Sequence, residues 1–377
     1  MAEPPPEPAP PQALAPRARG RREGVGDLFR GALRLWGRSG PRRFAFFTRA
    51  AWRLWRADRR RVRTQRLLGS SVPSVVAISP TMRCNYQCKG CYSRGRRTED
   101  ELSPAELDAL LSEAEAFGVL AIVVTGGEPL LRPDLIEQFE RHRRLLFVPV
   151  TNGALLSPES ARRIARSGNV VALVSIEGHP SDTDGRRGAD AHDTVLRAFA
   201  LLRQARACFG FAAMATAENA EHLATEAFVD AMVAEGCAVG YFTEYVPCGP
   251  AARPQWVLDA ATRRAFRKRV VELRRSKPIV LIQFPHDEYG DDNRCTAAGG
   301  TSLHINAQGD VEPCPFAPVA RESVRRGGLR AAFTSPFLRA VREHPRLLCR
   351  NDYACALFEN RAELEALARE HGARCSE

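Results

Sequence analysis

Three cysteines fall within eight residues in the segment RCNYQCKGCYSR, residues 83–94. Cys84, Cys88 and Cys91 are separated by three residues and then by two, with no fourth cysteine or histidine nearby. A structural zinc site closes its coordination shell with four such ligands. Three local thiolates therefore indicate a metal site that keeps one coordination position open, or a zinc knuckle that lacks a ligand.

A second group of cysteines, Cys295, Cys314, Cys349 and Cys355, lies in the last hundred residues. Gly309 marks the tip of a predicted hairpin that returns the chain so that Cys314 can face Cys295. Four thiolates can hold a [4Fe–4S] cluster, and a tetrahedral zinc ion accepts the same donors. The sequence therefore predicts a second metal site and leaves both metals open.

The cysteine content also indicates a cellular compartment. The chain has 377 residues and eleven cysteines, and its first twenty residues lack the apolar segment of a secretory signal. In a reducing cytosol such thiols are metal ligands or catalytic groups more often than disulfides. We therefore expect a cytoplasmic protein, in which the isolated Cys208 and Cys237 serve as small buried apolar side chains. Cys248 follows the sixth predicted strand, near the expected barrel mouth, and is a candidate for a further role.

Between residues 74 and 276, predicted strands alternate with predicted helices. The predicted strands are residues 75–79, 121–125, 147–151, 170–176, 208–215 and 239–245. The predicted helices are residues 103–118, 133–144, 157–167, 194–205, 221–235 and 259–276. Six β/α units in this order predict an α/β fold, a partial (β/α)6 TIM-like barrel. In such barrels chemistry gathers at the carboxyl ends of the strands, where the first cysteine loop falls.

Regions of different composition flank the predicted barrel. No internal repeat is apparent, and the last hundred residues break the β/α rhythm with a hairpin and a helix near residues 329–343. The predicted regions are a disordered Pro/Ala-rich tail at 1–20, a basic amphipathic extension of two short helices separated at Gly40-Pro41 within 21–70, the core barrel at 71–278, and a small cysteine-rich auxiliary domain at 279–377.

The formal net charge of +11 is concentrated at one end of the chain. Residues 1–70 carry 17 arginines and five acidic side chains, while the other 307 residues carry 38 basic and 39 acidic ones. A neutral body makes a nucleic-acid partner unlikely. The arginine stripe opposite Trp, Phe and Leu suits two arrangements: docking on the barrel, or contact of residues 25–66 with an anionic membrane surface. The second would place a cytoplasmic protein peripherally at the inner membrane face.

The segment TGGEP, residues 125–129, ends the second predicted strand. Together with the Cys84-x-x-x-Cys88-x-x-Cys91 loop, it resembles the radical S-adenosylmethionine (radical SAM) superfamily over roughly residues 74–270. The resemblance implies that the three cysteines hold a [4Fe–4S] cluster whose free iron binds S-adenosylmethionine (SAM). It also implies that SAM is cleaved reductively to a 5′-deoxyadenosyl radical, which abstracts hydrogen from a substrate.

The later cysteines refine this resemblance. They are similar to the shortened "twitch" form of the SPASM domain, which implies a second, auxiliary [4Fe–4S] cluster at Cys295, Cys314, Cys349 and Cys355. This combination resembles the branch with molybdopterin-biosynthesis and peptide-modifying members. Partners implied are an electron donor such as flavodoxin or ferredoxin and a substrate that is a peptide, a lipid or a small metabolite.

Several polar residues follow the predicted strands. Gly126 and Gly127 permit close approach of a ligand to the backbone, and Glu128 can accept a hydrogen bond from the SAM ammonium group. By resemblance, Ser175 and Glu177 take the ribose-binding position, and Asn219 makes a polar contact with SAM. Glu177 as a solvated strand end and Asn219 as a helix cap are the alternatives.

The residue before the third cysteine departs from the family pattern. Many members carry an aromatic residue there to pack near the adenine, whereas this chain has Gly90. Tyr92 and Tyr86 are the nearby candidates for that packing.

The acidic stretch PHDEYGDDNRC, residues 285–295, leads into the auxiliary region. Asp287, Glu288 and Tyr289 are candidates for orienting substrate or moving a proton, against the alternative of a solvated loop. The sequence thus favours a radical SAM enzyme, with a non-catalytic iron–sulfur assembly or maturation protein and a zinc-structured binding module as alternatives.

Overall fold

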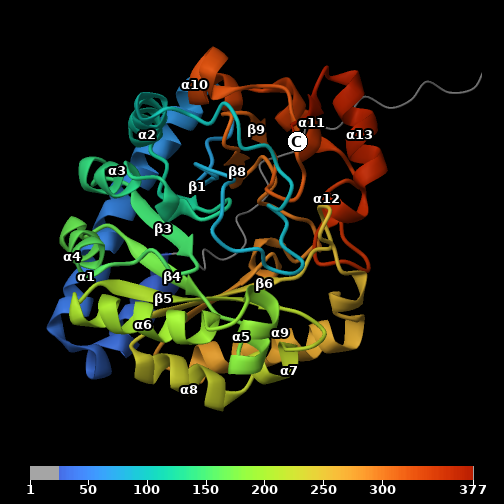
Figure 1. Ribbon diagram of the computed structural model, residues 1–377. Coiled ribbons are helices and arrows are strands. Elements are labelled where there is room, and N and C mark those ends of the chain that lie inside the picture. The colour runs from blue at the N-terminus through green and yellow to red at the C-terminus, as the bar shows by residue number, and fades with distance from the viewer. Residues whose placement is uncertain (1–24, 377) are drawn as a thin grey trace, which may run out of the picture.

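The computed structural model describes residues 25–376, with side chains described from residue 44 onward. The predicted tail at residues 1–20 lies outside the described residues. A nine-stranded sheet runs in the order β7-β6-β5-β4-β3-β2-β1-β8-β9 (Figure 1). Its strands are β1 (Val75–Ile78), β2 (Ala121–Val124), β3 (Leu146–Thr151), β4 (Val171–Ser175), β5 (Cys208–Ala215), β6 (Val239–Glu244), β7 (Val280–Phe284), β8 (Ser302–Ile305) and β9 (Val311–Glu312).

The predicted α/β class is confirmed, and the sheet extends further than the six predicted strands. Strands β1 to β7 are parallel neighbours in sequence order and curl into a half-barrel. At the other edge, β8 pairs in parallel with β1, and β9 pairs antiparallel with β8. The region after residue 278 therefore shares one sheet with the barrel core.

Helices cover the outer face of this sheet (Figure 1). They are α2 (Pro104–Phe117), α3 (Leu135–Arg141), α4 (Pro158–Ser167), α5 (Pro180–Arg187), α6 (Ala191–Gln204), α7 (Ala220–Leu223), α8 (Glu226–Glu235) and α9 (Ala260–Ser276), with 3-10 turns η1 (Pro129–Leu131), η2 (Pro254–Trp256) and η3 (His286–Glu288). Local sequence explains their ends. Ser103 and Glu106 form a capping box at the start of α2, and Gly118 ends that helix with a left-handed φ of 84°.

A single helix, α1 (Val25–Leu68), replaces the two short helices predicted around Gly40-Pro41, so that expectation was wrong. A proline removes one helical hydrogen bond, but tertiary packing determines helix stability more than local propensity does. The side chain of Phe47 packs against Val171, Leu173 and Val239 at the N-terminal ends of the strands. The inner side of α1 is therefore docked on the barrel.

Two further contacts fix α1. The Arg60 guanidinium donates to the carbonyl of Glu115 at 2.9 Å, and Gly118 approaches the α1 backbone. A Cβ on Gly118 would lie 2.4 Å from the backbone nitrogen of Arg61, which explains why this helix end needs glycine. No helix of the described residues is long and apolar enough to cross a membrane.

The C-terminal region wraps around the β8–β9 edge. It contains β10 (Val319–Ala320), α10 (Val324–Phe333), α11 (Pro336–Glu343), α12 (Ala356–Glu359), α13 (Arg361–Glu370) and β11 (Arg374–Cys375), with β10 and β11 paired antiparallel. The hairpin predicted at Gly309 is present, with a left-handed φ of 86° at that glycine. The one helix predicted near residues 329–343 is two, because Ser335 caps a new helix and Pro336 cannot continue the old one.

A buried polar chain joins β1 to this hairpin. Ser79 Oγ lies 2.7 Å from His304 Nε2, and His304 Nδ1 lies 2.6 Å from the Glu312 carboxylate. All three side chains are inaccessible to solvent. This hydrogen-bonded series therefore holds β1, β8 and β9 in place and takes no part in catalysis. It links the strand that precedes Cys84 to the strand that precedes Cys314.

Candidate active site

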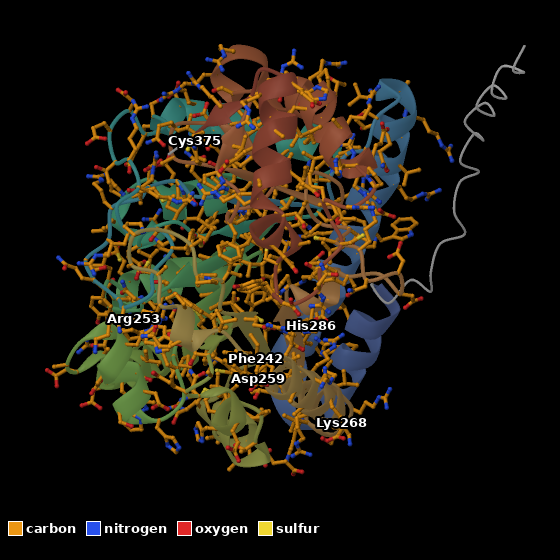
Figure 2. All side chains as sticks on the ribbon, turned by 90° about the vertical axis from the view of Figure 1, so that its right-hand side faces the viewer. Phe242, Arg253, Asp259, Lys268, His286 and Cys375 are labelled. Carbon is orange, nitrogen blue, oxygen red and sulfur yellow. The ribbon has the colours of Figure 1, made fainter. Side chains whose placement is uncertain are left out.

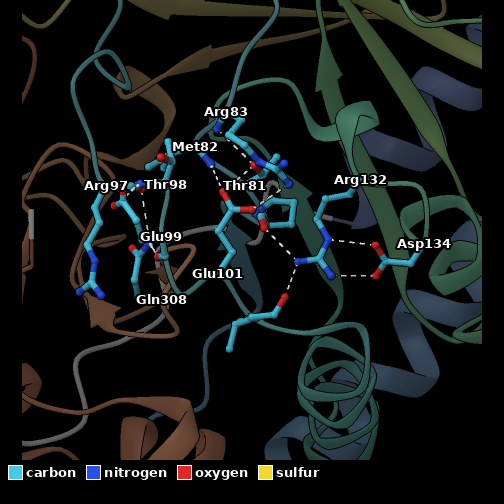
Figure 3. Close-up of polar contacts among 12 residues, drawn as sticks. Thr81, Met82, Arg83, Arg97, Thr98, Glu99, Glu101, Arg132, Asp134 and Gln308 are labelled. Carbon is cyan, nitrogen blue, oxygen red and sulfur yellow. Dashed lines mark hydrogen bonds and ion pairs between the residues drawn. The ribbon is translucent and has the colours of Figure 1, made fainter.

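The first three cysteines lie on the loop after β1, at the carboxyl ends of the strands. Glu101 anchors the start of this loop (Figure 3). Its carboxylate accepts hydrogen bonds from the Thr81 hydroxyl at 2.6 Å, the Met82 amide at 3.0 Å and the Arg83 guanidinium at 3.2 Å. A carboxylate with three donors holds the backbone immediately before Cys84 in one path.

A buried arginine at the end of the turn η1, which follows β2, reinforces the same anchor. The Arg132 guanidinium donates to the carbonyl of Pro80 at 3.1 Å and to the carbonyl of Leu102, and it forms a two-bonded ion pair with Asp134 (Figure 3). The Gln308 amide donates to the carbonyl of Glu99 at 2.8 Å. These contacts tie both ends of the cysteine loop to the sheet and to the Gly309 hairpin.

The glycines of TGGEP serve the loop itself. A Cβ on Gly126 would lie 2.4 Å from the carbonyl oxygen of Thr81, and one on Gly127 would lie 2.1 Å from that of Arg83. The Gly127 amide donates to Thr81, and the Glu128 amide donates to Arg83, each at 2.9 Å. Glycine is therefore required here because the TGGEP backbone approaches the backbone of the cysteine loop closely, and not only because a ligand can approach it.

Glu128 lies at the cavity wall with its carboxylate already bonded. It accepts from the Thr151 hydroxyl at 2.7 Å, the Asn152 amide at 2.8 Å and the Leu130 amide at 3.0 Å. Burial raises the pKa of Glu128 above its ordinary value, although these donors favour the charged form. One of its oxygens accepts a single hydrogen bond here, so it can accept another from a ligand.

Ser175 and Glu177 leave β4 in different directions. Ser175 lines the central cavity, whereas the buried Glu177 pairs with the guanidinium groups of Arg186 and Arg187 on α5. Burial opposes ionisation of Glu177, but the two arginines outweigh it and lower its pKa. Because its carboxylate is held by these arginines and by the Met214 amide at 3.2 Å, Glu177 positions the arginines.

Both arginines line the central cavity, and the sequence interpretation missed them. The α5 backbone also touches the cysteine loop, since the Lys89 amide donates to the carbonyl of Arg186 at 2.9 Å. Arg187 carries an electrostatic interaction with the Cys88 and Cys91 thiols. The signal in the sequence was DGRRG, two adjacent arginines between glycines after the fourth strand, with an acid at position 177 to receive them.

Asn219 lies behind this wall. Its amide donates to the carbonyls of Glu177 and Met214, both at 3.0 Å, and its oxygen accepts from the Thr216 amide at 2.8 Å. Every polar atom of the side chain is therefore bonded within the protein. Asn219 fixes the turns after β4 and β5, and the expected contact with SAM stays a prediction.

Aromatic residues from another element occupy the space beside Gly90. A Cβ on Gly90 would lie 2.6 Å from the Trp256 ring and 3.2 Å from the Tyr245 ring. The hydroxyl of Tyr92 is bonded to the TGGEP segment: it lies 2.9 Å from the Thr125 hydroxyl and accepts a hydrogen bond from the Gly126 amide. The segment after β6 thus supplies an aromatic surface next to the third cysteine. Tyr86 and Tyr92 both line the cavity, and packing of either against adenine stays a prediction.

A single cavity of about 640 Å³ occupies the inside of the half-barrel. Apolar side chains of the inner strand faces and of α1 form most of its wall. Its polar lining includes Glu128, Ser175, Tyr241, Glu288 and the two α5 arginines. The cysteines that line it are Cys84, Cys88, Cys91, Cys295, Cys314 and Cys355. The structure thus brings six of the seven predicted metal-binding thiols to one chamber, and Cys349 is the exception.

Part of the chain matches a known protein family. The model described as "Radical SAM superfamily" matches residues 78–228, which run from the end of β1 into α8 and include the cysteine loop and TGGEP. Residues 78–228 are therefore a radical SAM domain. The relatives that are similar to this chain carry the names of enzymes.

Among them, Fe-coproporphyrin III synthase of Methanosarcina barkeri is 36% identical over 33% of this chain and 32% of its own length. AdoMet-dependent heme synthase of the same organism is 26% identical over 69% of this chain and 82% of its own length. Mycofactocin maturase MftC of Mycobacterium tuberculosis is 32% identical over 36% of each chain. The chain therefore spans only about a third of two of these three relatives.

Solved structures agree on the radical SAM fold. Streptococcus suis SuiB bound to S-adenosylmethionine superposes with a TM-score of 0.64 at 18% identity, covering 76% of this chain and 71% of that one. Native anSMEcpe with bound AdoMet gives 0.58 at 16% identity, covering 78% and 99%.

A radical SAM domain implies a [4Fe–4S] cluster and SAM, and the loop residues fit such a group. In the described residues, no three Cys, His, Asp or Glu side chains converge as they would around one metal ion. A single zinc ion needs all its donors at one point, whereas a cluster takes each thiolate on a separate iron. Three thiols on one loop that face one chamber supply the donors that such a cluster takes from the protein.

The second cysteine group is divided. The thiols of Cys314 and Cys355 are hydrogen-bonded to each other, which raises the pKa of Cys314 and lowers that of Cys355. Burial raises the pKa of Cys295 to about 11. Cys349 lies apart, with its sulfur 3.7 Å from the carbonyl of Pro345, and it does not line the chamber. A role for Cys349 as fourth ligand stays a prediction.

The acidic stretch separates into three roles. Asp287 pairs with Arg267 and Arg274 and accepts from the Gln283 amide, so it caps the end of β7. Glu288 lines the chamber, where burial and the neighbouring Asp287 raise its pKa to about 7. Tyr289 also lines the chamber, and its hydroxyl is bonded to the carbonyl of Ala354 and the amide of Ala356. Exchange of a proton between Glu288 and a substrate stays a prediction.

Cys375, another thiol of the C-terminal region, is exposed on β11. Figure 2 shows it far from His286, near which the auxiliary segment begins. Cys375 is not among the six cysteines that line the chamber.

Proposed function

We propose that this protein binds SAM at a [4Fe–4S] cluster held by Cys84, Cys88 and Cys91, and uses it to abstract hydrogen from a substrate in the half-barrel chamber. When bound, the reduced cluster supplies the electron that cleaves SAM to methionine and a 5′-deoxyadenosyl radical, which removes the hydrogen atom. The observation that supports this proposal is the single chamber shared by the cysteine loop and the second cysteine group.

The wall residues of the chamber suit the parts of SAM. Arg186 and Arg187 bring two positive charges beside the cysteine loop, where a carboxylate would be stabilised. Glu128 can accept from an ammonium group, and Ser175 can bond a ribose hydroxyl. The rings of Tyr245 and Trp256 beside the loop offer an apolar surface for adenine.

The deeper chamber would hold the substrate and exclude water from it. Its apolar strand faces and the α1 side chains close the N-terminal end, so a radical formed there meets few alternative partners. Glu288 stands at the opposite wall, beside the second cysteine group, and can take or give a proton. We propose that Cys295, Cys314 and Cys355, with Cys349 as the prospective fourth ligand, hold an auxiliary cluster that assists the reaction.

The proposal is tested with anaerobically reconstituted protein, a reductant and SAM. Flavodoxin or ferredoxin is the electron donor we expect in the cell, and dithionite serves in vitro. Release of 5′-deoxyadenosine is the expected result. Its absence from protein that contains iron and sulfide would instead favour an assembly or maturation role.

A further inference from the structure

The outer side of α1 is a surface that the proposed reaction does not use. Figure 2 shows this helix along one edge of the molecule, with side chains projecting from it. Among its described side chains the exposed ones follow a spacing of three or four residues. They are Arg49, Trp52, Trp55, Arg56, Arg59, Arg63, Arg66 and Leu67, which we name the outer arc.

The outer arc is narrow and long. At 100° per residue its members fall within about 120° of the helix circumference, and from the first to the last it spans about 27 Å. The opposite side carries Phe47, Ala50 and Ala57, which are buried against the protein. The contact of α1 with the barrel buries only this inner side. It does not explain why the side chains of the outer arc are apolar and basic.

The arc exposes large apolar groups that a solvated helix would not need. Trp52 is 57% exposed, Trp55 is 48% exposed and Leu67 is 77% exposed. The guanidinium of Arg56 lies 4.7 Å from the centre of the Trp52 ring, and that of Arg59 lies 4.7 Å from the Trp55 ring. Each tryptophan is thus paired with a cation at the surface.

The charge of the arc is unbalanced. It has five arginines and no acidic residue, and no carboxylate in the side chains that the structure describes pairs with any of the five. The nearest acid on the helix, Asp58, is bonded to Arg61 away from the arc. Five cations that have no carboxylate partner among the described side chains, beside two tryptophans and a leucine, form an anion-attracting surface with an apolar component.

We propose that the outer arc binds an anionic membrane surface. Tryptophan rings settle at the lipid–water interface, and arginines bind lipid phosphates while their stems lie along apolar surface. A strand of RNA needs a basic groove that follows its backbone, whereas this arc is the convex face of one helix on a body with 38 basic and 39 acidic side chains beyond residue 70. The helix then lies flat, with the barrel on its other side.

The test is co-sedimentation of the full-length, cluster-loaded protein with lipid vesicles. Wild type is expected to bind vesicles that contain phosphatidylglycerol and not pure phosphatidylcholine vesicles, with weaker binding at high salt. The arc variant R56Q/R59Q/R63Q should lose affinity about a hundredfold, from roughly fivefold per arginine. A matched variant with the same charge change, R162Q/R339Q/R369Q, removes exposed arginines elsewhere and should bind as wild type does.

Two further measurements make the result specific. W52A/W55A should also weaken vesicle binding, because these rings are exposed and contribute apolar contact. All the variants should release 5′-deoxyadenosine like wild type, and binding itself requires no SAM cleavage, so this test is independent of the proposed function. Equal binding by the arc variant and its matched control, no binding of wild type to anionic vesicles, or displacement from vesicles by poly(U) RNA would each overturn the proposal.

Discussion

The hydroxyl of Tyr289 lies between the two peptide groups that flank Cys355. It donates to the carbonyl of Ala354 at 3.1 Å and accepts from the amide of Ala356 at 2.9 Å. The backbone of Tyr289 also forms a bridge with Cys295. One residue between the barrel and the C-terminal region thus contacts the backbone at two of the three thiols that the second cysteine group contributes to the chamber.

Replacing Tyr289 with phenylalanine tests whether its hydroxyl positions these thiols. Two buried backbone groups lose their partner, so we expect Y289F to lower the free energy of unfolding by roughly 1–3 kcal/mol. Iron content should fall toward that of the loop cluster alone, while SAM cleavage persists. Y353F is the matched control, because Tyr353 is 37% exposed. Normal iron content in Y289F would show that the Tyr289 hydroxyl does not position the site.

The Gly127→Ala variant tests the contact between TGGEP and the cysteine loop. The new Cβ would lie 2.1 Å from the Arg83 carbonyl oxygen, so the loop must move. We expect a loss of roughly 2 kcal/mol or more in unfolding free energy, with loss of loop-bound iron. In Gly185→Ala the new Cβ meets nothing within 4 Å, and that variant should retain its iron. Equal iron retention in both variants would contradict the account.

Removing the Glu177 carboxylate should release the two chamber arginines. E177Q leaves buried guanidinium groups without their counter-charge, which we expect to cost about 3 kcal/mol of unfolding free energy at pH 7. Because the folded pKa of Glu177 is lowered, its stabilisation is present above about pH 4.3 and lost as the pH falls through the folded value. Wild type and E177Q should therefore converge in acid, as chemical denaturation would show. E218Q, at an exposed acid, is the control.

For the chamber carboxyl Glu288 we expect the opposite dependence of stability on pH. Its folded pKa of about 7 lies above the unfolded value of about 4.3, so the folded state loses stability as the pH rises between those values. E288Q should be more stable than wild type above pH 7, by roughly 2 kcal/mol after allowance for water in the chamber. The two should match below pH 4. Thermal unfolding from pH 4 to 8 measures this, and a constant gap would contradict the pKa shift.

Local spacing made the first half of the site predictable. The cysteine loop and TGGEP each lie within a few residues of a strand end, so periodicity alone placed them at the same edge of the sheet. Helix α5 was missed because only Thr183 among its residues is buried, which leaves no apolar period to detect. The pairing of Glu177 with α5, and its role as a positioning residue, could not be inferred without that helix.

Long-range pairing explains the other differences. Strand β7 at one edge of the sheet and strand β8 between β1 and β9 are short segments whose places depend on tertiary contacts. The aromatic surface beside Gly90 comes from Trp256, more than 160 residues away along the chain. Sequence spacing likewise could not separate Cys349 from Cys355, although only the second lines the chamber.

The most direct test of the central claim is electron paramagnetic resonance of the reduced C314A/C355A variant, with and without SAM. This variant should keep only the cluster at Cys84, Cys88 and Cys91, with about four irons per chain. The account predicts that added SAM changes the signal of that cluster, because one iron is left open for it. An iron-free variant, or a signal that SAM leaves unchanged, would contradict the claim.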